Sequence, residues 1–204
     1  MSTREGLLFV ARSKEFDDLT AVTAARDVFW ERGYASTSLS QLQSATGLSK
    51  SSLYETYGSK RGLFARAASN YLDTVVGPRL APVEAAGAGP AELAGYFTGL
   101  AEFFDRAPSQ IARRGCLLLN TAMDLNDLDE EAATLVRNYR ARVQAAFLGV
   151  CRGRVPDAEA EILTAAQIGL MVTSRLDPAL ACSLARSLAA RVSAWPADEA
   201  PPAS

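Results

Sequence analysis

Apolar residues recur at helical spacing along most of the chain. The clearest pattern lies in residues 37–64. One short apolar face ends at Gly47, a residue that stops helices because it adopts left-handed backbone conformations without strain, and a second ends at Gly58. The inward positions of the two faces are Leu39, Leu42 and Ala45, and then Leu53. The pattern predicts two short helices joined by a tight turn, which is a helix-turn-helix.

Small polar residues begin each of these helices. Thr37 or Ser38 is expected to cap the first helix, Ser49 the second and Ser59 a third, because their hydroxyls accept backbone N–H groups of the first turn. The second helix opens with Lys, Ser and Ser at positions 50–52, which suits a close approach to base edges and phosphates. We therefore expect this helix to enter the major groove of DNA.

Two cations stand where the helix dipole disfavours them. Lys60 and Arg61 occupy the first turn of the third helix, which carries partial positive charge and favours Asp or Glu. A phosphate in front of this turn would explain both residues, since helix N-termini and cations bind anions. The alternative is that they are two solvated charges at a surface corner.

Residues 16–72 resemble the DNA-binding domain of the tetracycline-repressor (TetR) family of bacterial transcriptional regulators. The resemblance rests on several spaced segments: residues 29–34, 37–39, 46–49, 53–54, 59–60 and 63–64. It implies that Lys50, Ser51 and Ser52 open the recognition helix and approach bases. It also implies that phosphates are held by Thr37, Tyr54, Tyr57 and Lys60.

Three positions depart from the family pattern. Many relatives have Ala at the position of Gln43, Gly or Pro at Ser51, and Glu at Gly62. The departure at Gln43 bears on the packing of the two helices, and that at Ser51 on which bases are read. The departure at Gly62 removes the acceptor of a capping box at the start of the following helix.

The chain beyond residue 60 is predicted to be helical almost throughout, with no alternating strand. The expected helices cover residues 61–76, 91–105, 113–125, 127–151, 157–173 and 178–194, and a loop rich in Ala, Gly and Pro covers 81–90. The fold class is therefore all-α. We expect a flexible arm (1–15), a three-helix helix-turn-helix domain (16–60), a six-helix ligand-binding and dimerisation domain (61–196) and a disordered tail (197–204).

Composition narrows the function classes. The chain has 204 residues, a formal net charge of −2 and no histidine, so the commonest general base and metal ligand are missing. No Gly-rich phosphate loop or nucleophile elbow occurs, and the cysteines lack metal or disulfide spacing. No stretch is long and apolar enough to span a membrane or serve as a signal peptide. We expect a cytoplasmic protein that is no enzyme and needs no cofactor.

The last two helices carry faces suited to pairing. Leucines recur every fourth residue in one, and small residues recur on a face of the other; the residues are Leu180, Leu184 and Leu188, and Ile162, Ala166 and Gly169. We expect a homodimer through these faces, because a two-fold dimer reads both halves of an inverted-repeat operator in double-stranded DNA. The alternative is that both faces pack only inside one chain.

A candidate effector site lies in residues 114–125. Cys116, Asn120 and Met123 share one helical face, which mixes a thiol, an amide and a thioether. With Phe104, Tyr139, Phe147 and Met171 they are predicted to line an apolar cavity for a small-molecule effector, and the resemblance implies a pocket in this half of the chain. The alternative is an ordinary core in which Asn120 bonds a helix carbonyl.

The expected function is a repressor that a small, mostly apolar ligand releases from its operator. Three alternatives stay open at this level. Cys116, close to Arg113 and Arg114, is the candidate thiol for a switch driven by oxidation or an electrophile. The others are a helical enzyme that uses carboxylates and a protein that coats nucleic acids without sequence preference.

Overall fold

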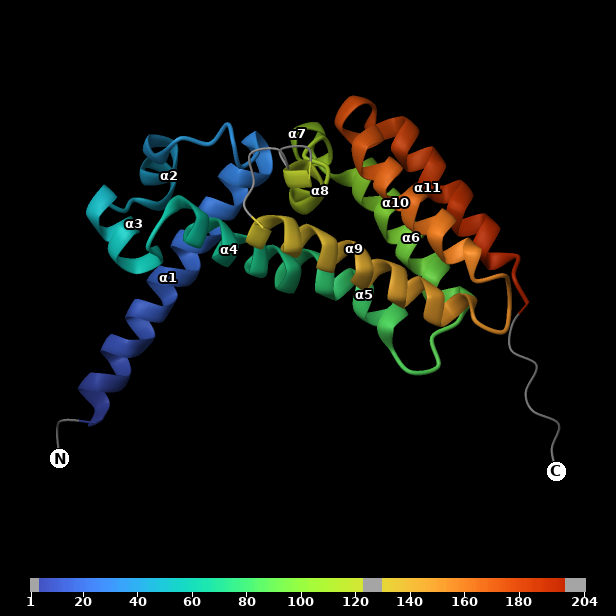
Figure 1. Ribbon diagram of the computed structural model, residues 1–204, viewed down its shortest axis with the longest axis horizontal. Helices are drawn as coiled ribbons and strands as arrows, with labels where there is room; N and C mark the ends of the chain where they lie inside the picture. The colour runs from blue at the N-terminus through green and yellow to red at the C-terminus, as the bar shows by residue number, and fades with distance from the viewer. Residues whose placement is uncertain (1–3, 123–129, 197–204) are drawn as a thin grey trace. The chain divides into compact units, whose positions relative to one another are not determined.

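The computed structural model describes residues 4–122 and 130–196, with side chains from residue 18 onward. Within these residues every regular element is a helix, which confirms the all-α class (Figure 1). The chain divides into two compact units, Met1–Asp73 and Thr74–Ser204.

The N-terminal unit is built around one long helix. Its elements are α1 (Arg4–Arg32), α2 (Leu39–Thr46), α3 (Lys50–Tyr57) and α4 (Lys60–Tyr71), and α1 packs against both α2 and α4. Aromatic rings fill the contact between α1 and α4: the Phe29 and Phe64 ring centroids lie 5.3 Å apart edge to face, and those of Trp30 and Tyr71 lie 4.9 Å apart.

The helix-turn-helix signals in the sequence are confirmed. Gly47 and Gly58 end α2 and α3 with φ of 70° and 73°. Ser38 caps α2 in a reciprocal capping box with Gln41. The hydroxyls of Ser49 and Ser59 accept backbone N–H groups at the starts of α3 and α4.

The C-terminal unit consists of further helices. A π-helical segment, η1 (Leu72–Val76), spans the boundary and leads to α5 (Gly77–Glu84), α6 (Pro90–Arg106), α7 (Ser109–Ala112), α8 (Leu117–Ala122), α9 (Glu130–Cys151), α10 (Ala158–Leu176) and α11 (Pro178–Ser193). Helix α11 packs along α6 and against α10, α10 also packs against α9, and α9 contacts α5 (Figure 1). The interior contains Phe97 and Phe147, neither of which is exposed.

Two expected boundaries in the N-terminal half were wrong. Helix α1 begins at Arg4, so most of the segment expected to be an arm is helical. The unit boundary follows Asp73 rather than residue 60, because α4 packs on α1 and so belongs to the N-terminal unit.

The proline-rich segment after α4 also differs from the expectation. Residues 81–84 are helical although Pro82 lies inside α5. The buried side chains of Leu80 and Val83 explain this, since packing of an apolar face outweighs intrinsic helix propensity. The helix expected over residues 61–76 thus corresponds to α4 and η1, and α5 lies beyond its expected end.

The helix expected over 113–125 begins later in the structure. Residues 113–116 connect α7 to α8 without being helical, with φ of 65° at Gly115, and the described part of the expected helix is α8. A Cβ atom on Gly115 would lie 2.9 Å from the carbonyl oxygen of Met171, so the turn is seated directly on the backbone of α10. Residues 123–129, which include Met123 and the start of the helix expected over 127–151, lie outside the described residues.

The close packing of Gly115 on α10 predicts that alanine substitutions at two glycines change the free energy of unfolding in opposite directions. Gly115→Ala is expected to lower the free energy of unfolding by at least about 1 kcal/mol, because the left-handed backbone and the close oxygen both oppose a side chain. Gly95→Ala, in the middle of α6 with open space around the added methyl, is expected to raise it by about 0.5–1 kcal/mol. Urea denaturation measures both, and equal effects would contradict the account.

Candidate nucleic-acid interface

Helix α3 presents its first turn to solvent. Lys50 and Ser51 are exposed, while Ser52 is half-buried. The Ser49 hydroxyl accepts the N–H of Ser52 at 3.1 Å and lies within 2.9 Å of the hydroxyls of both Ser51 and Ser52. The start of the helix is therefore held by its own serines, and Lys50 projects beside them as a cation. This is the surface that sequence analysis predicted for base contacts.

Tyr54 of α3 and Lys60 at the start of α4 are two further residues that are predicted to hold phosphates. Tyr54 is 47% exposed, which is unusual for a large aromatic side chain. The Lys60 ammonium lies 4.6 Å from the centroid of the Tyr34 ring, a cation–π contact that holds it at the first turn of α4. Tyr54 is therefore exposed, whereas Lys60 is half-buried, and a phosphate contact by either residue stays a prediction.

Thr37 and Tyr57 are placed differently. Thr37 is 2% exposed, and its hydroxyl donates to the Gly33 carbonyl at 2.6 Å. The Tyr57 hydroxyl donates to the Asp18 carboxylate at 2.8 Å. Burial, and then the hydrogen bond and charge of Asp18, raise the pKa of Tyr57 above its usual value. Both hydroxyls thus make contacts inside the N-terminal unit, whereas Lys50, Ser51 and Tyr54 are exposed and Lys60 is half-buried.

The sequence carried no signal for Asp18. Its carboxylate accepts from Tyr57 of α3 and, at 2.8 Å, from Arg66 of α4, so it joins residues far apart in the chain. A cleft of about 460 Å³ adjoins this junction, lined by Asp18, Thr56, Tyr57, Gly62 and Arg66.

Comparison with known proteins agrees with this geometry. The family model described as "Bacterial regulatory proteins, tetR family" matches residues 21–67. The chain is 31% identical to the uncharacterized HTH-type transcriptional regulator YezE of Bacillus subtilis over 138 residues, 68% of this chain and 70% of the relative. It is also 31% identical to the HTH-type transcriptional repressor ComR of Escherichia coli over 157 residues, 71% and 70% of the two chains.

The chain belongs to the TetR family of bacterial transcriptional regulators. One similar solved structure is a cysteine variant of the TetR-family regulator CifR bound to a 26-base-pair operator duplex. It is 25% identical, has a TM-score of 0.63, and the match covers 87% of this chain and 95% of that one. The helix-turn-helix of this TetR-family regulator is accordingly a DNA-binding element.

The residues predicted to bind an effector lie mostly in the interior of the C-terminal unit. Phe104, Cys116, Tyr139, Phe147 and Met171 are buried, Asn120 is half-buried, and Met123 is outside the described residues. Asn120 donates to the Arg114 carbonyl at 2.8 Å, which is the structural role that the alternative interpretation foresaw.

Two polar residues missed by the sequence analysis join this interior. The Gln167 amide donates to the Tyr139 hydroxyl at 3.2 Å. The Tyr96 ring packs edge to face on Phe147 with centroids 5.4 Å apart, and burial, then the nearby Cys116, raises the pKa of Tyr96. In the sequence Gln167 looks like any polar residue of a helix, and its burial in the structure is what identifies it as part of the interior.

An apolar strip runs along the outside of α10 and α11. Ile162 is 54% exposed, Leu180 49% and Leu184 42%, while Gly169 is exposed and Ala166 and Leu188 are half-buried. Val172 and Leu176, which sequence analysis did not select, extend the strip at 50% and 75% exposure. These exposed fractions are the opposite of what packing inside one chain would give.

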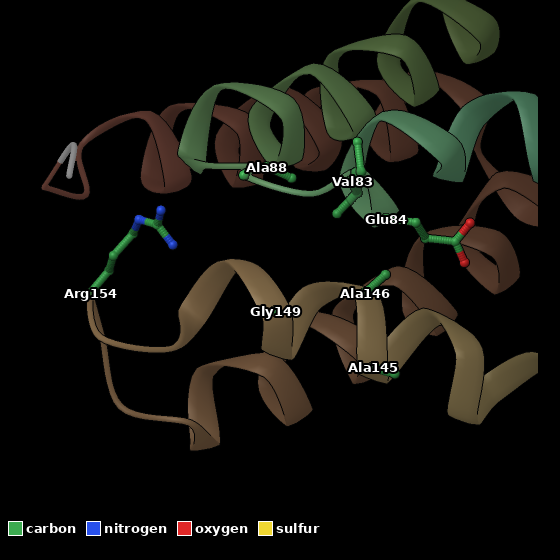
Figure 2. Close-up of a pocket in the computed structure, with 9 residues that line it drawn as sticks. Val83, Glu84, Ala88, Ala145, Ala146, Gly149 and Arg154 are labelled. Carbon is green, nitrogen blue, oxygen red and sulfur yellow. The ribbon is translucent and has the colours of Figure 1, made fainter.

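A separate cleft of about 330 Å³ lies between the α5–α6 connection and the second half of α9 (Figure 2). Short side chains form most of its wall, with Glu84 and Arg154 as its charged residues. Glu84 accepts two hydrogen bonds from Arg142, at 2.7 and 2.8 Å, which hold the pKa of Glu84 below its usual range. No residue predicted to bind an effector lines this cleft.

The described residues contain no cluster of side chains that would hold a metal ion. Among the same residues, none of the helices combines the length and apolar character that crossing a membrane requires.

The two lysines of the interface are expected to act differently. Lys60→Ala should weaken binding to every DNA sequence and lower the salt slope by about one, because it removes one phosphate neutralisation. Lys50→Ala should weaken binding and also change the preferred sequence, because Lys50 is predicted to approach bases. Fluorescence titrations against a duplex series at several salt concentrations measure both. A Lys50→Ala variant with unchanged affinity and preference would contradict the assignment of α3.

Proposed function

We propose that this TetR-family regulator is a repressor that binds an inverted-repeat operator as a homodimer and leaves it when a small, mostly apolar ligand binds. The name of ComR, a repressor at 31% identity, supports the direction of control. The exposed strip on α10 and α11 supports the dimer and is the observation that carries the proposal. Its site of action is the cytoplasm, where a bacterial regulator meets its DNA.

The dimer follows from exposure and from DNA geometry. Large apolar side chains gathered on neighbouring helices mark an interface rather than an ordinary surface. Helix α3 has eight residues, so one copy reads few base pairs. A two-fold pair presents two such helices to successive major grooves and doubles the sequence that is read.

The ligand acts through the spacing of the two recognition helices. The chain runs from Lys60 at the start of α4 through η1 into α5, whose Leu80 and Val83 are buried in the C-terminal unit. A ligand among the interior aromatic residues shifts the equilibrium only as far as it binds one spacing more tightly than the other. The buried rings of Tyr139 and Phe147 favour a mostly apolar ligand, and the hydrogen-bonded pair of Gln167 and Tyr139 offers it a polar contact.

The burial of the thiols disfavours a cysteine switch in this conformation. Cys116 is 1% exposed and Cys182 is 4% exposed. Cys151 is fully buried, and burial raises the pKa of its thiol to about 11, which leaves little thiolate. The similar structure of CifR carries cysteine substitutions, so we would test this alternative with Cys116→Ser. We propose no enzymatic activity.

Selection from a random duplex pool tests the function. The purified protein should enrich an inverted repeat at moderate salt. An enriched sequence without two-fold symmetry would contradict the dimeric mode of reading. Enrichment of no sequence by the folded protein would indicate non-specific coating.

A charge placed in the strip should separate the protomers. Leu184→Glu is expected to convert the dimer to a monomer and to reduce operator affinity at least about a hundredfold, because a carboxylate is costly to bury in an apolar interface. Ala190→Glu, on an exposed position of the same helix outside the strip, is the matched control and should stay dimeric. Light scattering after size exclusion measures mass. A Leu184→Glu variant that remains dimeric would place the interface elsewhere.

A further inference from the structure

Helix α3 has few attachments to the rest of its unit. It has eight residues, and Leu53 is the one that is buried. A single buried side chain holds a helix at one point and leaves rotation about that point open. Residues four apart share a face of a helix, so Tyr57 lies on the same side as Leu53, one turn further on. A second attachment at Tyr57 would fix the direction of α3.

Asp18 of α1 supplies this attachment. Its Oδ1 atom accepts the Tyr57 hydroxyl at 2.8 Å, and its Oδ2 atom accepts Nη2 of Arg66 at 2.8 Å. The Asp18 side chain is 31% exposed, so it lies half in the unit rather than in open solvent. One carboxylate thus joins α1, α3 and α4, and its own position is held by Arg66.

Gly62 brings the same end of α3 close to α4. A Cβ atom at this position would lie 2.0 Å from the carbonyl oxygen of Tyr57. No side chain fits there, so the absence of one lets the last turn of α3 rest on the first turn of α4. This close approach holds Tyr57 from the backbone side while Asp18 holds it from the hydroxyl.

We propose that Asp18 is a positioning residue for DNA recognition, which sets the orientation of α3 through the Tyr57 hydroxyl. Tyr57 then serves the scaffold rather than a phosphate. Base contacts depend on the angle at which side chains reach the groove, whereas phosphate contacts depend mainly on charge. Loss of the Asp18–Tyr57 hydrogen bond therefore reduces discrimination between sequences more than it reduces binding to DNA in general. The proposal rests on the DNA-binding function of the family.

Tyr57→Phe tests the proposal because it removes the hydroxyl and keeps the ring. The ratio of affinity for the duplex selected by the wild-type protein to affinity for an unrelated duplex should fall about tenfold, with unrelated binding unchanged. Tyr54→Phe is the matched control on the same helix, and it should weaken both duplexes by the same factor if Tyr54 contacts a phosphate. Equal weakening of both duplexes by Tyr57→Phe, or no effect, would overturn the proposal.

A double-mutant cycle identifies the partner. Asp18→Ala removes a negative charge and so strengthens binding to all DNA, but the affinity ratio cancels this general effect. If the two residues act through one hydrogen bond, the ratio for the double variant equals that of either single variant. Losses that simply multiply would show that Asp18 does not act through Tyr57.

Hydrogen exchange gives a readout that needs no DNA. Tyr57→Phe should speed amide exchange in residues 50–57 while residues 39–46 of α2 keep their rates. Unchanged exchange in α3 would overturn the proposal whatever the DNA result. A wild-type protein that selects no duplex would instead contradict the proposed function and leave this measurement to decide the role of Asp18.

Discussion

A recognition helix must expose polar side chains and still be held in a fixed orientation. The structure of the N-terminal unit meets both requirements. Helix α3 buries only Leu53, so its position depends on its ends. Ser49 holds the start, and Gly58, Gly62 and the Asp18–Tyr57 hydrogen bond hold the finish. The long helix α1 provides the rigid side of this arrangement, and the aromatic contacts between α1 and α4 keep that side in place. In our proposal, precise reading of DNA therefore depends on residues that never reach a base.

The C-terminal unit, by contrast, exposes apolar side chains at its surface. It keeps an interior of aromatic and small apolar residues while leaving an apolar strip outside on α10 and α11. A monomer would expose that strip to water at a cost proportional to its area. In the homodimer that we propose, pairing of two chains removes the cost and fixes two recognition helices at one spacing. Control by the proposed ligand then needs only a small change in that spacing.

The sequence predicted the features that depend on local interactions and missed those that depend on contacts between residues far apart in the chain. Capping by Ser38 and Ser49 and the ends at Gly47 and Gly58 are local, and all were predicted. Asp18 and Gln167 act across long stretches of chain, so no pattern marked them. The segment around Pro82 was mistaken for loop because tertiary packing overrode its local preference. The helix expected from residue 113 begins only at Leu117, because the turn at Gly115 lies against α10, a contact that sequence spacing does not show.

Two copies of α3 that read DNA at a fixed spacing would leave a characteristic footprint. Hydroxyl-radical footprinting on the selected duplex shows which stretches of backbone the protein covers. We expect two protected segments related by a two-fold axis, with centres about one helical turn, or a multiple of it, apart. A single protected segment, or protection without two-fold symmetry, would contradict this expectation.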